Sequence, residues 1–151
     1  MTKTDDFIAN RLIWKASSHS LPTSFSFFYR DITADTQRYL SSFIDIESTG
    51  QPVLFFTKPT TEWTLICTRV VICNDNKKVF RINISDIERF KPTMLDKFKE
   101  GKPIDPKEIK KSEWDKLTII DKLGNSFVLH AEKGSDLFAL WNILLMATRL
   151  S

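Results

Sequence analysis

Seven short runs of β-forming residues follow one another from residue 53 onward, and this succession constrains the fold more than any other feature of the chain. Most of the segments between them contain Thr, Pro, Asn, Asp, Ser or Gly, which favour turns. Short strands separated by turns predict an antiparallel β domain. The runs are VLFF (53–56), WTLIC (63–67), VVIC (70–73), VFRINI (79–84), IERF (87–90), LTIID (117–121) and SFVLHA (126–131).

The most convincing hairpin turn is NDNKK (74–78), because Asn and Asp tolerate the left-handed backbone that a tight return needs. In the run after it, Phe80, Ile82 and Ile84 alternate with other residues. Successive side chains of a strand point to opposite faces, so we expect these three on the core. Ser85 and Asp86 follow, and we interpret Asp86 as a residue that bonds nearby backbone N–H groups.

An amphipathic helix is predicted at the end of the chain. Ser135 is a suitable N-cap, with Asp136 beside it. Along one face of this helix, apolar residues recur at spacings of three and four. We expect that face to cover the open end of the sheet, and its residues are Leu137, Leu140, Trp141, Leu144 and Thr148.

The first 50 residues have a different, partly helical pattern. Thr4, Asp5 and Asp6 form a helix start signal, after which Phe7, Ile8, Leu12 and Trp14 are expected on one side of a helix. Alternation in 25–29 predicts a strand, and 33–48 reads as a second helix that Gly50 and Pro52 end. We therefore divide the chain into an N-terminal arm, 1–50, packed on a β domain, 51–151.

Residues 52–150 resemble the bacterial pleckstrin-homology and GRAM-type families. The matching residues are Leu65, Ile66, Arg69, Val70, Val71 and Ile72, followed by Ile82, Ser85, Asp86 and Ile87. In place of the threonine usual three residues before the arginine, this chain has Ile66, with Thr68 adjacent to the arginine. The resemblance implies an α+β fold that is mainly β: a seven-stranded pleckstrin-homology-like barrel capped by a C-terminal helix and preceded by the partly helical arm.

Composition argues against several classes of function. The net charge of +3 and the alternation of lysines with acids give no basic stripe, so no nucleic-acid partner is expected. The chain has no apolar run of membrane-spanning length and no basic-then-apolar leader pattern at its start. Two cysteines in neighbouring apolar runs, Cys67 and Cys73, favour reduced thiols, although a disulfide between them stays open. Together these features predict a cytoplasmic protein.

Few residues suggest catalysis. The four glycines are too scattered for a phosphate-binding loop, and the two histidines, His19 and His130, lack metal-site spacing to Cys or Asp. Cys67 or Cys73 with His130 is the one conceivable nucleophile system, but thiols in apolar strands are usually inert. We therefore expect no enzyme activity, no metal and no cofactor.

The sequence predicts a non-catalytic binding module, with an unidentified protein or peptide as the favoured partner and a homodimer left open. Peripheral binding to anionic lipid is the alternative, although the first hairpin loop carries one lysine, Lys58, against Glu62. Arg69 is expected to brace a loop or to pair with an acid. A charge-dense connection at 91–116 is expected to be functional or mobile. The candidate contacts for a ligand or partner are Lys58, Arg69, Lys97, Lys99 and Lys102.

Overall fold

The structure is a computed structural model that describes residues 4–92 and 115–150. The expectations for residues 93–114, including the contacts assigned to Lys97, Lys99 and Lys102, lie outside these ranges. The elements in chain order are α1 (Asp5–Ser18), β1 (Ser26–Phe28), η1 (Tyr29–Asp31), α2 (Ala34–Ser41), α3 (Ile46–Thr49), β2 (Pro52–Thr57), β3 (Trp63–Cys67), β4 (Val70–Asn74), β5 (Val79–Asn83), η2 (Ile84–Asp86), β6 (Ile87–Pro92), β7 (Lys116–Asp121), β8 (Ser126–His130) and α4 (Ser135–Leu150).

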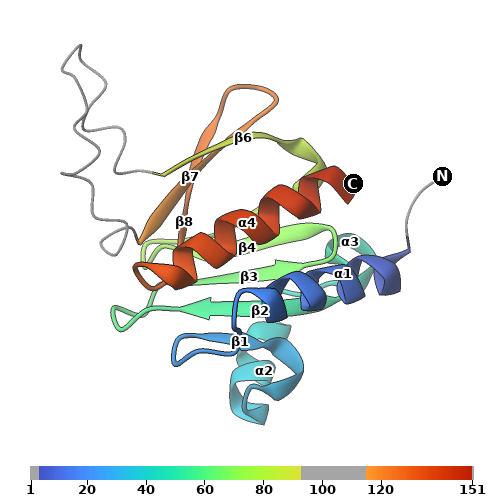
Figure 1. Ribbon diagram of the computed structural model, residues 1–151, viewed down its shortest axis with the longest axis vertical. Coiled ribbons are helices and arrows are strands. Elements are labelled where there is room, and N and C mark those ends of the chain that lie inside the picture. The colour runs from blue at the N-terminus through green and yellow to red at the C-terminus, as the bar shows by residue number, and fades with distance from the viewer. Residues whose placement is uncertain (1–3, 93–114, 151) are drawn as a thin grey trace.

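The strands form two antiparallel sheets, which Figure 1 shows together with the helices. Strands β1 to β5 pair in chain order in one sheet, and β6 to β8 pair in the other. The seven strands predicted from residue 53 onward are confirmed as β2 to β8, and the fold is α+β as expected. Among the described strands β5 and β6 do not pair, so these strands do not close into one continuous barrel.

The short helix η2 separates the two sheets along the chain. The Ile84 N–H donates to the Arg69 carbonyl oxygen at 2.9 Å, and the Lys122 N–H donates to the Asp86 carbonyl oxygen at 3.0 Å. The Asp86 carboxylate accepts from the Asn83 side-chain amide at 3.2 Å, so its observed partner is a side chain where a backbone N–H was expected. These bonds turn the chain out of the first sheet.

The central strands β2 to β4 are buried on both faces. Because side chains alternate along a strand, one set of their residues packs toward α1 and α4, and the other set packs toward α2. We call the first cluster the inner core; it includes Leu12, Leu54, Phe56, Ile66, Val71, Leu129, Leu140, Ile143 and Leu144. We call the second cluster the outer core; its buried members are Leu40, Phe55, Trp63, Leu65, Cys67, Val70 and Ile72.

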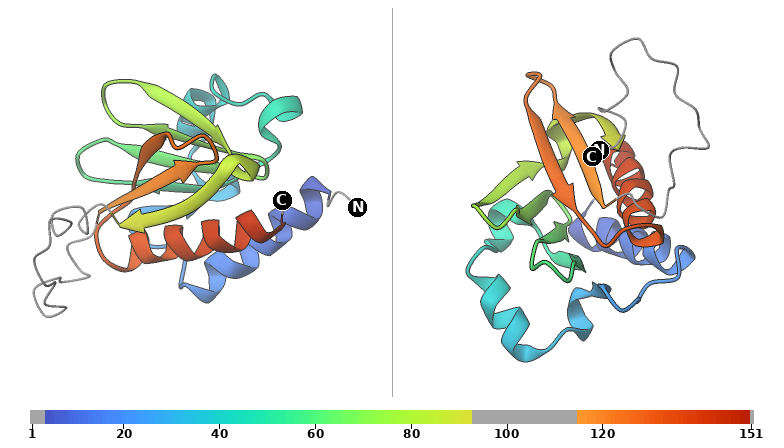
Figure 2. Two further views of the ribbon diagram at one scale, coloured as in Figure 1. Left: turned by 90° about the horizontal axis from the view of Figure 1, so that it is seen from above. Right: turned by 90° about the vertical axis from the view of Figure 1, so that its left-hand side faces the viewer.

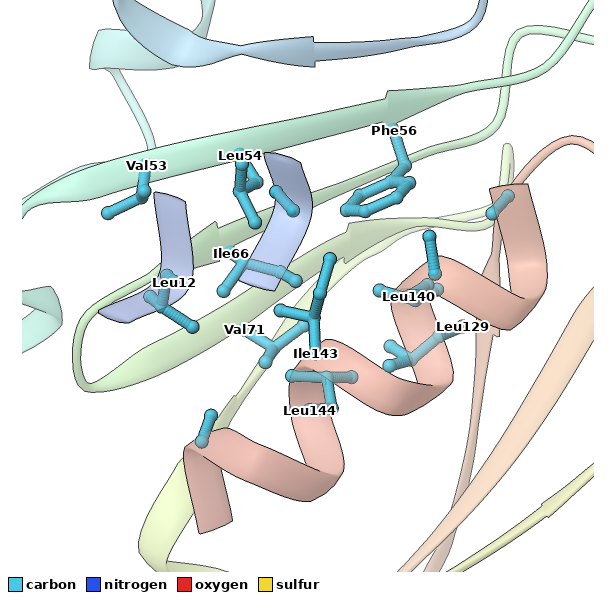
Figure 3. Close-up of a cluster of buried hydrophobic side chains, with 14 of the residues drawn as sticks. Leu12, Val53, Leu54, Phe56, Ile66, Val71, Leu129, Leu140, Ile143 and Leu144 are labelled. Carbon is cyan, nitrogen blue, oxygen red and sulfur yellow. The ribbon is translucent and has the colours of Figure 1, made fainter. Parts of the chain in front are cut away.

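Helices α1 and α4 lie side by side on one side of the five-stranded sheet, and α2 and α3 lie on the other, as Figure 2 shows. Figure 3 shows Leu12 of α1 and Leu140, Ile143 and Leu144 of α4 pointing into the inner core. Burial of each such side chain stabilises the fold by roughly 1.5–3 kcal/mol. The first and last helices of the chain therefore share one core.

The N-terminal arm is continuous with the sheet. Its strand β1 pairs antiparallel with β2, with Phe27 opposite Phe55. The single helix predicted for 33–48 is wrong: the chain forms α2 and α3 with a break between them. Asp45 explains the break, because its carboxylate caps the N-terminus of α3 and accepts from the Glu47 N–H at 3.2 Å.

The prediction for the apolar side of α1 is correct for two of its four residues. Ile8 and Leu12 are buried in the inner core. Phe7 and Trp14, which we expected beside them, are exposed instead. Their positions lie on the opposite side of the helix, because the buried set continues through Ala9 and Ala16.

Helix α4 spans Ser135–Leu150, so Ser135 is its first helical residue and not the N-cap that was predicted. Leu137, Leu140 and Leu144 of its expected face are buried. Its buried face also includes Ile143, which the prediction missed, whereas Trp141 is half-buried. Of the helices described, none is long and apolar enough to span a lipid bilayer.

An acid at the start of α4 ties the arm to this helix. The buried Asp136 carboxylate accepts from the Thr23 hydroxyl at 2.8 Å and from the Ser26 hydroxyl at 2.9 Å. Thr23 lies in the loop before β1, and Ser26 is the first residue of β1. Residues more than a hundred positions apart in the chain are therefore joined through one buried carboxylate.

Candidate functional site

The outer face of α1 presents large side chains to solvent. Phe7, Asn10, Arg11 and Trp14 follow the spacing of one helix face, and all four are exposed. The side chain of Phe7 is 44% exposed and that of Trp14 is 55% exposed. The Arg11 guanidinium lies over the Trp14 ring, 4.8 Å from its centroid, which is a cation–π geometry. We call these four residues the α1 stripe.

The start of α1 is fixed in place by its own sequence. The Thr4 hydroxyl accepts from the Phe7 N–H at 3.1 Å, and Asp5 and Asp6 lie in the first turn, where acids stabilise the helix dipole. The Asp6 carboxylate also accepts from the Gln51 side-chain amide at 2.6 Å. The stripe is thus carried by a capped helix that is attached to the sheet.

Arg69 lies in the two-residue turn between β3 and β4 and joins it to α1. Its Nε and Nη2 atoms donate to the two oxygens of Asp5 at 3.0 and 2.7 Å, and its Nη1 donates to the Glu47 carbonyl oxygen at 2.7 Å. The Arg69 guanidinium holds the pKa of Asp5 below its ordinary value, and the Thr68 hydroxyl, 2.9 Å from the same carboxylate, adds to this effect. Arg69 is therefore a bracing residue that pairs with an acid, as the sequence predicted.

Gly50 makes room for this junction. Its φ of +74° lies where L side chains are rarely found, and a Cβ there would lie 2.0 Å from the Thr68 hydroxyl oxygen. That hydroxyl accepts from the Gln51 N–H at 3.0 Å. A residue larger than glycine would push the hydroxyl out of its place between Gln51 and Asp5.

Lys58 lies at the opposite end of the sheet, at the start of the loop between β2 and β3. Its side chain is 5% exposed, and its Nζ is 2.9 Å from Nδ1 of the buried His130 and 3.0 Å from a carboxylate oxygen of Asp115. Burial, and then the nearby Lys58 charge, lower the pKa of His130 from its ordinary value near 6.5. The lysine predicted as a surface contact is therefore buried and paired.

Thr64 joins the two sheets beside this cluster. Its buried hydroxyl donates to the His130 carbonyl oxygen at 2.6 Å and accepts from the His130 N–H at 3.2 Å. Thr64 belongs to β3 and His130 ends β8, so both bonds cross from one sheet to the other. They hold the backbone of His130 in place.

The two cysteines lie on opposite faces of the five-stranded sheet. Cys67 belongs to the outer core and Cys73 to the inner core, and both are free thiols. Burial raises the pKa of Cys67 to about 12 and that of Cys73 to about 11. Thiols with such pKa values are almost entirely protonated near neutral pH, which makes them poor nucleophiles. A single site that combines Cys67, Cys73 and His130 is therefore not formed.

Sequence reasoning missed the α1 stripe, although a signal for it was present. Apolar residues occur at positions 7, 8, 12 and 14, and these positions cannot all share one narrow face of a helix. Two of them had to face away from the core. The partners of Lys58 and Arg69 carried no comparable signal, because Asp115 and Asp5 are more than fifty residues away from them in the chain.

Within residues 4–92 and 115–150, no group of three or more His, Cys, Asp or Glu side chains is arranged to hold a metal ion. These residues form a mixed aromatic and cationic face on α1, a partly exposed junction between Arg69 and Asp5, and a buried polar cluster around Lys58 and His130. Comparison of the chain with models of protein families, with curated proteins and with solved structures gave no match.

Proposed function

We propose that the protein is a non-catalytic module that binds a protein or peptide through the α1 stripe. The observation that carries this proposal is the exposure of Phe7 and Trp14 on one face of a helix whose other face is buried. Binding energy at protein interfaces is concentrated in a few residues, and Trp, Tyr and Arg are enriched among them. The stripe combines Trp14 with Arg11, which is stacked on it.

The chemistry of the stripe defines the partner that we propose. Phe7 and Trp14 suit an apolar side chain of the partner, and the guanidinium of Arg11 suits a carboxylate, which it can bind through two parallel hydrogen bonds. The ring of Trp14 keeps the guanidinium in position. The proposed partner is therefore a peptide segment or protein surface that combines apolar and acidic residues.

We also propose that residues 52–150 are a pleckstrin-homology-like module, a finer assignment than the α+β class. Seven strands in antiparallel order followed by a C-terminal helix support it, as does the resemblance around Arg69 and Asp86. Such modules present edge strands or grooves to partners, and some pair with added strands. In this chain the proposed contact lies instead on the helix that the arm adds beside α4.

The alternative, peripheral binding to anionic lipid, is less well supported. Binding of anionic head groups needs several accessible cations, each of which contributes about 1 kcal/mol near the surface. Lys58 is buried against His130 and Asp115, and Arg69 is paired with Asp5. The first turn of α1 also carries Asp6, an acid that an anionic surface would repel.

Selection of peptides on the folded protein tests the proposal. Peptides are selected from a random phage-displayed library on the wild-type protein, and their binding is then compared with that of the double variant Phe7→Ala/Trp14→Ala. The matched control is Leu123→Ala, because Leu123 is 87% exposed at a remote hairpin. We expect acidic–apolar peptides whose Kd rises at least about 30-fold in the double variant and is unchanged in the control. Peptides that bind all three proteins equally would contradict the proposal.

Two further measurements separate the alternatives. Sedimentation with vesicles containing phosphatidylserine tests the lipid alternative, and salt-sensitive pelleting that Arg11→Ala abolishes would favour it over a peptide partner. Analytical ultracentrifugation of the wild type and the double variant tests whether a second copy occupies the stripe. A concentration-dependent dimer that the double variant loses would identify that partner as the chain itself.

A further inference from the structure

The cluster around Lys58 contains an arrangement of protons that depends on pH. An ammonium group can only donate hydrogen bonds, so the 2.9 Å contact from Lys58 Nζ requires Nδ1 of His130 to be unprotonated. The imidazole is then neutral and carries its proton on Nε2. A proton added to Nδ1 would place two donors and two positive charges against each other at this distance.

Charged side chains lie near the imidazole on the elements packed against it. Lys58 and Lys116 oppose its protonation, whereas Glu62, Asp115 and the acid of the β4–β5 turn, Asp75, favour it. The thiol of Cys73 adds no charge at neutral pH because its pKa is about 11. Burial, the largest cause, and the two lysines lower the pKa of His130, and the three carboxylates oppose that lowering, so the ring takes up its proton below its ordinary value near 6.5.

The backbone on both sides of the contact is fixed. Thr64 holds the His130 backbone through two hydrogen bonds. The tip of the β2–β3 loop is held by Asn76, whose side-chain amide donates to the Thr60 carbonyl oxygen at 2.7 Å and accepts from the Thr61 hydroxyl at 2.9 Å. The long side chain of Lys58 is therefore the part that can move.

We propose that His130 and Lys58 form a proton-operated switch: when His130 takes up a proton, the Lys58 ammonium leaves its buried position beside the imidazole and becomes exposed at the surface. Asp115 then exchanges its contact with Lys58 for one with the protonated imidazole or with water. Above the transition the cation is hidden, and below it two positive charges lie near the start of β7 and the end of β8. This switch is independent of the α1 stripe and of its partner.

Competitive acetylation of the full chain tests the switch. Acetic anhydride is used in trace amount, and the modification of Lys58 is measured by mass spectrometry relative to Lys77, which is exposed in the β4–β5 turn. The ratio cancels the effect of pH on amine reactivity that both lysines share. We expect this ratio to be low at about pH 8 and to rise severalfold as the pH falls through the titration of His130, which NMR of the ring follows in parallel.

Two variants make the test specific. His130→Asn keeps a hydrogen-bond acceptor near the Nδ1 position but cannot take up a proton, so its ratio should stay low at every pH; His130→Gln serves the same purpose if the first variant does not fold. His19→Asn removes the other histidine and should behave as the wild type. A ratio that stays flat in the wild type while His130 titrates would overturn the proposal, and so would a rise that persists in the His130 variants.

Discussion

The guanidinium of Arg69 meets the carboxylate of Asp5 through two parallel contacts of 3.0 and 2.7 Å, and so joins the first turn of α1 to the turn between β3 and β4. Arg69 also donates to the carbonyl oxygen of Glu47, in α3. Elements that cover opposite faces of the five-stranded sheet thus meet at one side chain. This junction fixes the N-terminal arm on the sheet.

Asp5→Asn is expected to lower stability at neutral pH, because it removes the charge that Arg69 binds. Since the pKa of Asp5 is lower in the folded state than its ordinary value of 3.8, its contribution to stability is present above that value and is lost as pH falls through the folded-state pKa. Urea unfolding at about pH 7 and about pH 3 should therefore show a smaller difference between variant and wild type in acid. Asp35→Asn, in an exposed pair with Arg38, should change little at either pH.

Gly50→Ala is expected to destabilise the protein by about 1–3 kcal/mol from backbone strain, with more from the clash against the Thr68 hydroxyl. The matched control is Gly124→Ala, because Gly124 also has a positive φ but has nothing within 4 Å of an added Cβ. Chemical denaturation of both variants measures the difference. Equal losses of stability would show that the fit of Gly50 against Thr68 is unimportant.

Thr64→Val is expected to cost about 1–3 kcal/mol, because a buried hydroxyl that both donates to and accepts from His130 is replaced by a methyl group. Thr64→Ser keeps the hydroxyl and should lose less. Thermal unfolding monitored by circular dichroism gives the comparison. If the valine variant is as stable as the wild type, the hydroxyl does not join the two sheets as we infer.

Both native cysteines should resist alkylation near neutral pH. Cys67 and Cys73 have pKa values of about 12 and about 11, and both are buried, so we expect iodoacetamide to label them only after unfolding in guanidinium. Leu123→Cys provides an exposed thiol in the same protein for comparison. Rapid labelling of native Cys73 beside His130 would reopen the question of catalysis.

The parts of the fold that were predicted correctly depend on local patterns. The strands β2 to β8 have short runs bounded by turn residues, and α4 has a start signal followed by a long apolar face, so each could be located from its own residues. The pairing of Asp5 with Arg69 and of Lys58 with His130 could not, because each joins residues more than sixty positions apart. Such contacts depend on tertiary packing, which no spacing rule encodes.

The sequence contains a physical reason why the N-terminal arm covers one face of the five-stranded sheet. WTLIC and VVIC are continuously apolar, and strands of that kind are usually covered on both faces. A C-terminal helix covers only one face of a sheet. The second cover had to come from elsewhere in the chain, and in the structure it comes from α2 and the segments around it.

The central claim is that the first 50 residues are an integral part of the fold. The same packing holds α1, with its exposed stripe, on the five-stranded sheet. A chain that starts at Gln51 lacks α1, β1, α2 and α3, and it exposes outer-core side chains such as Trp63 and Leu65. At roughly 1.5–3 kcal/mol for each such side chain, the loss is comparable with the whole stability of a domain, about 5–15 kcal/mol.

Urea unfolding of the chain from Gln51, with light scattering beside the full-length protein, is the most direct measurement. The account predicts aggregation or the absence of a cooperative transition for the shortened chain. A soluble monomer with the same free energy of unfolding as the full-length protein would contradict it.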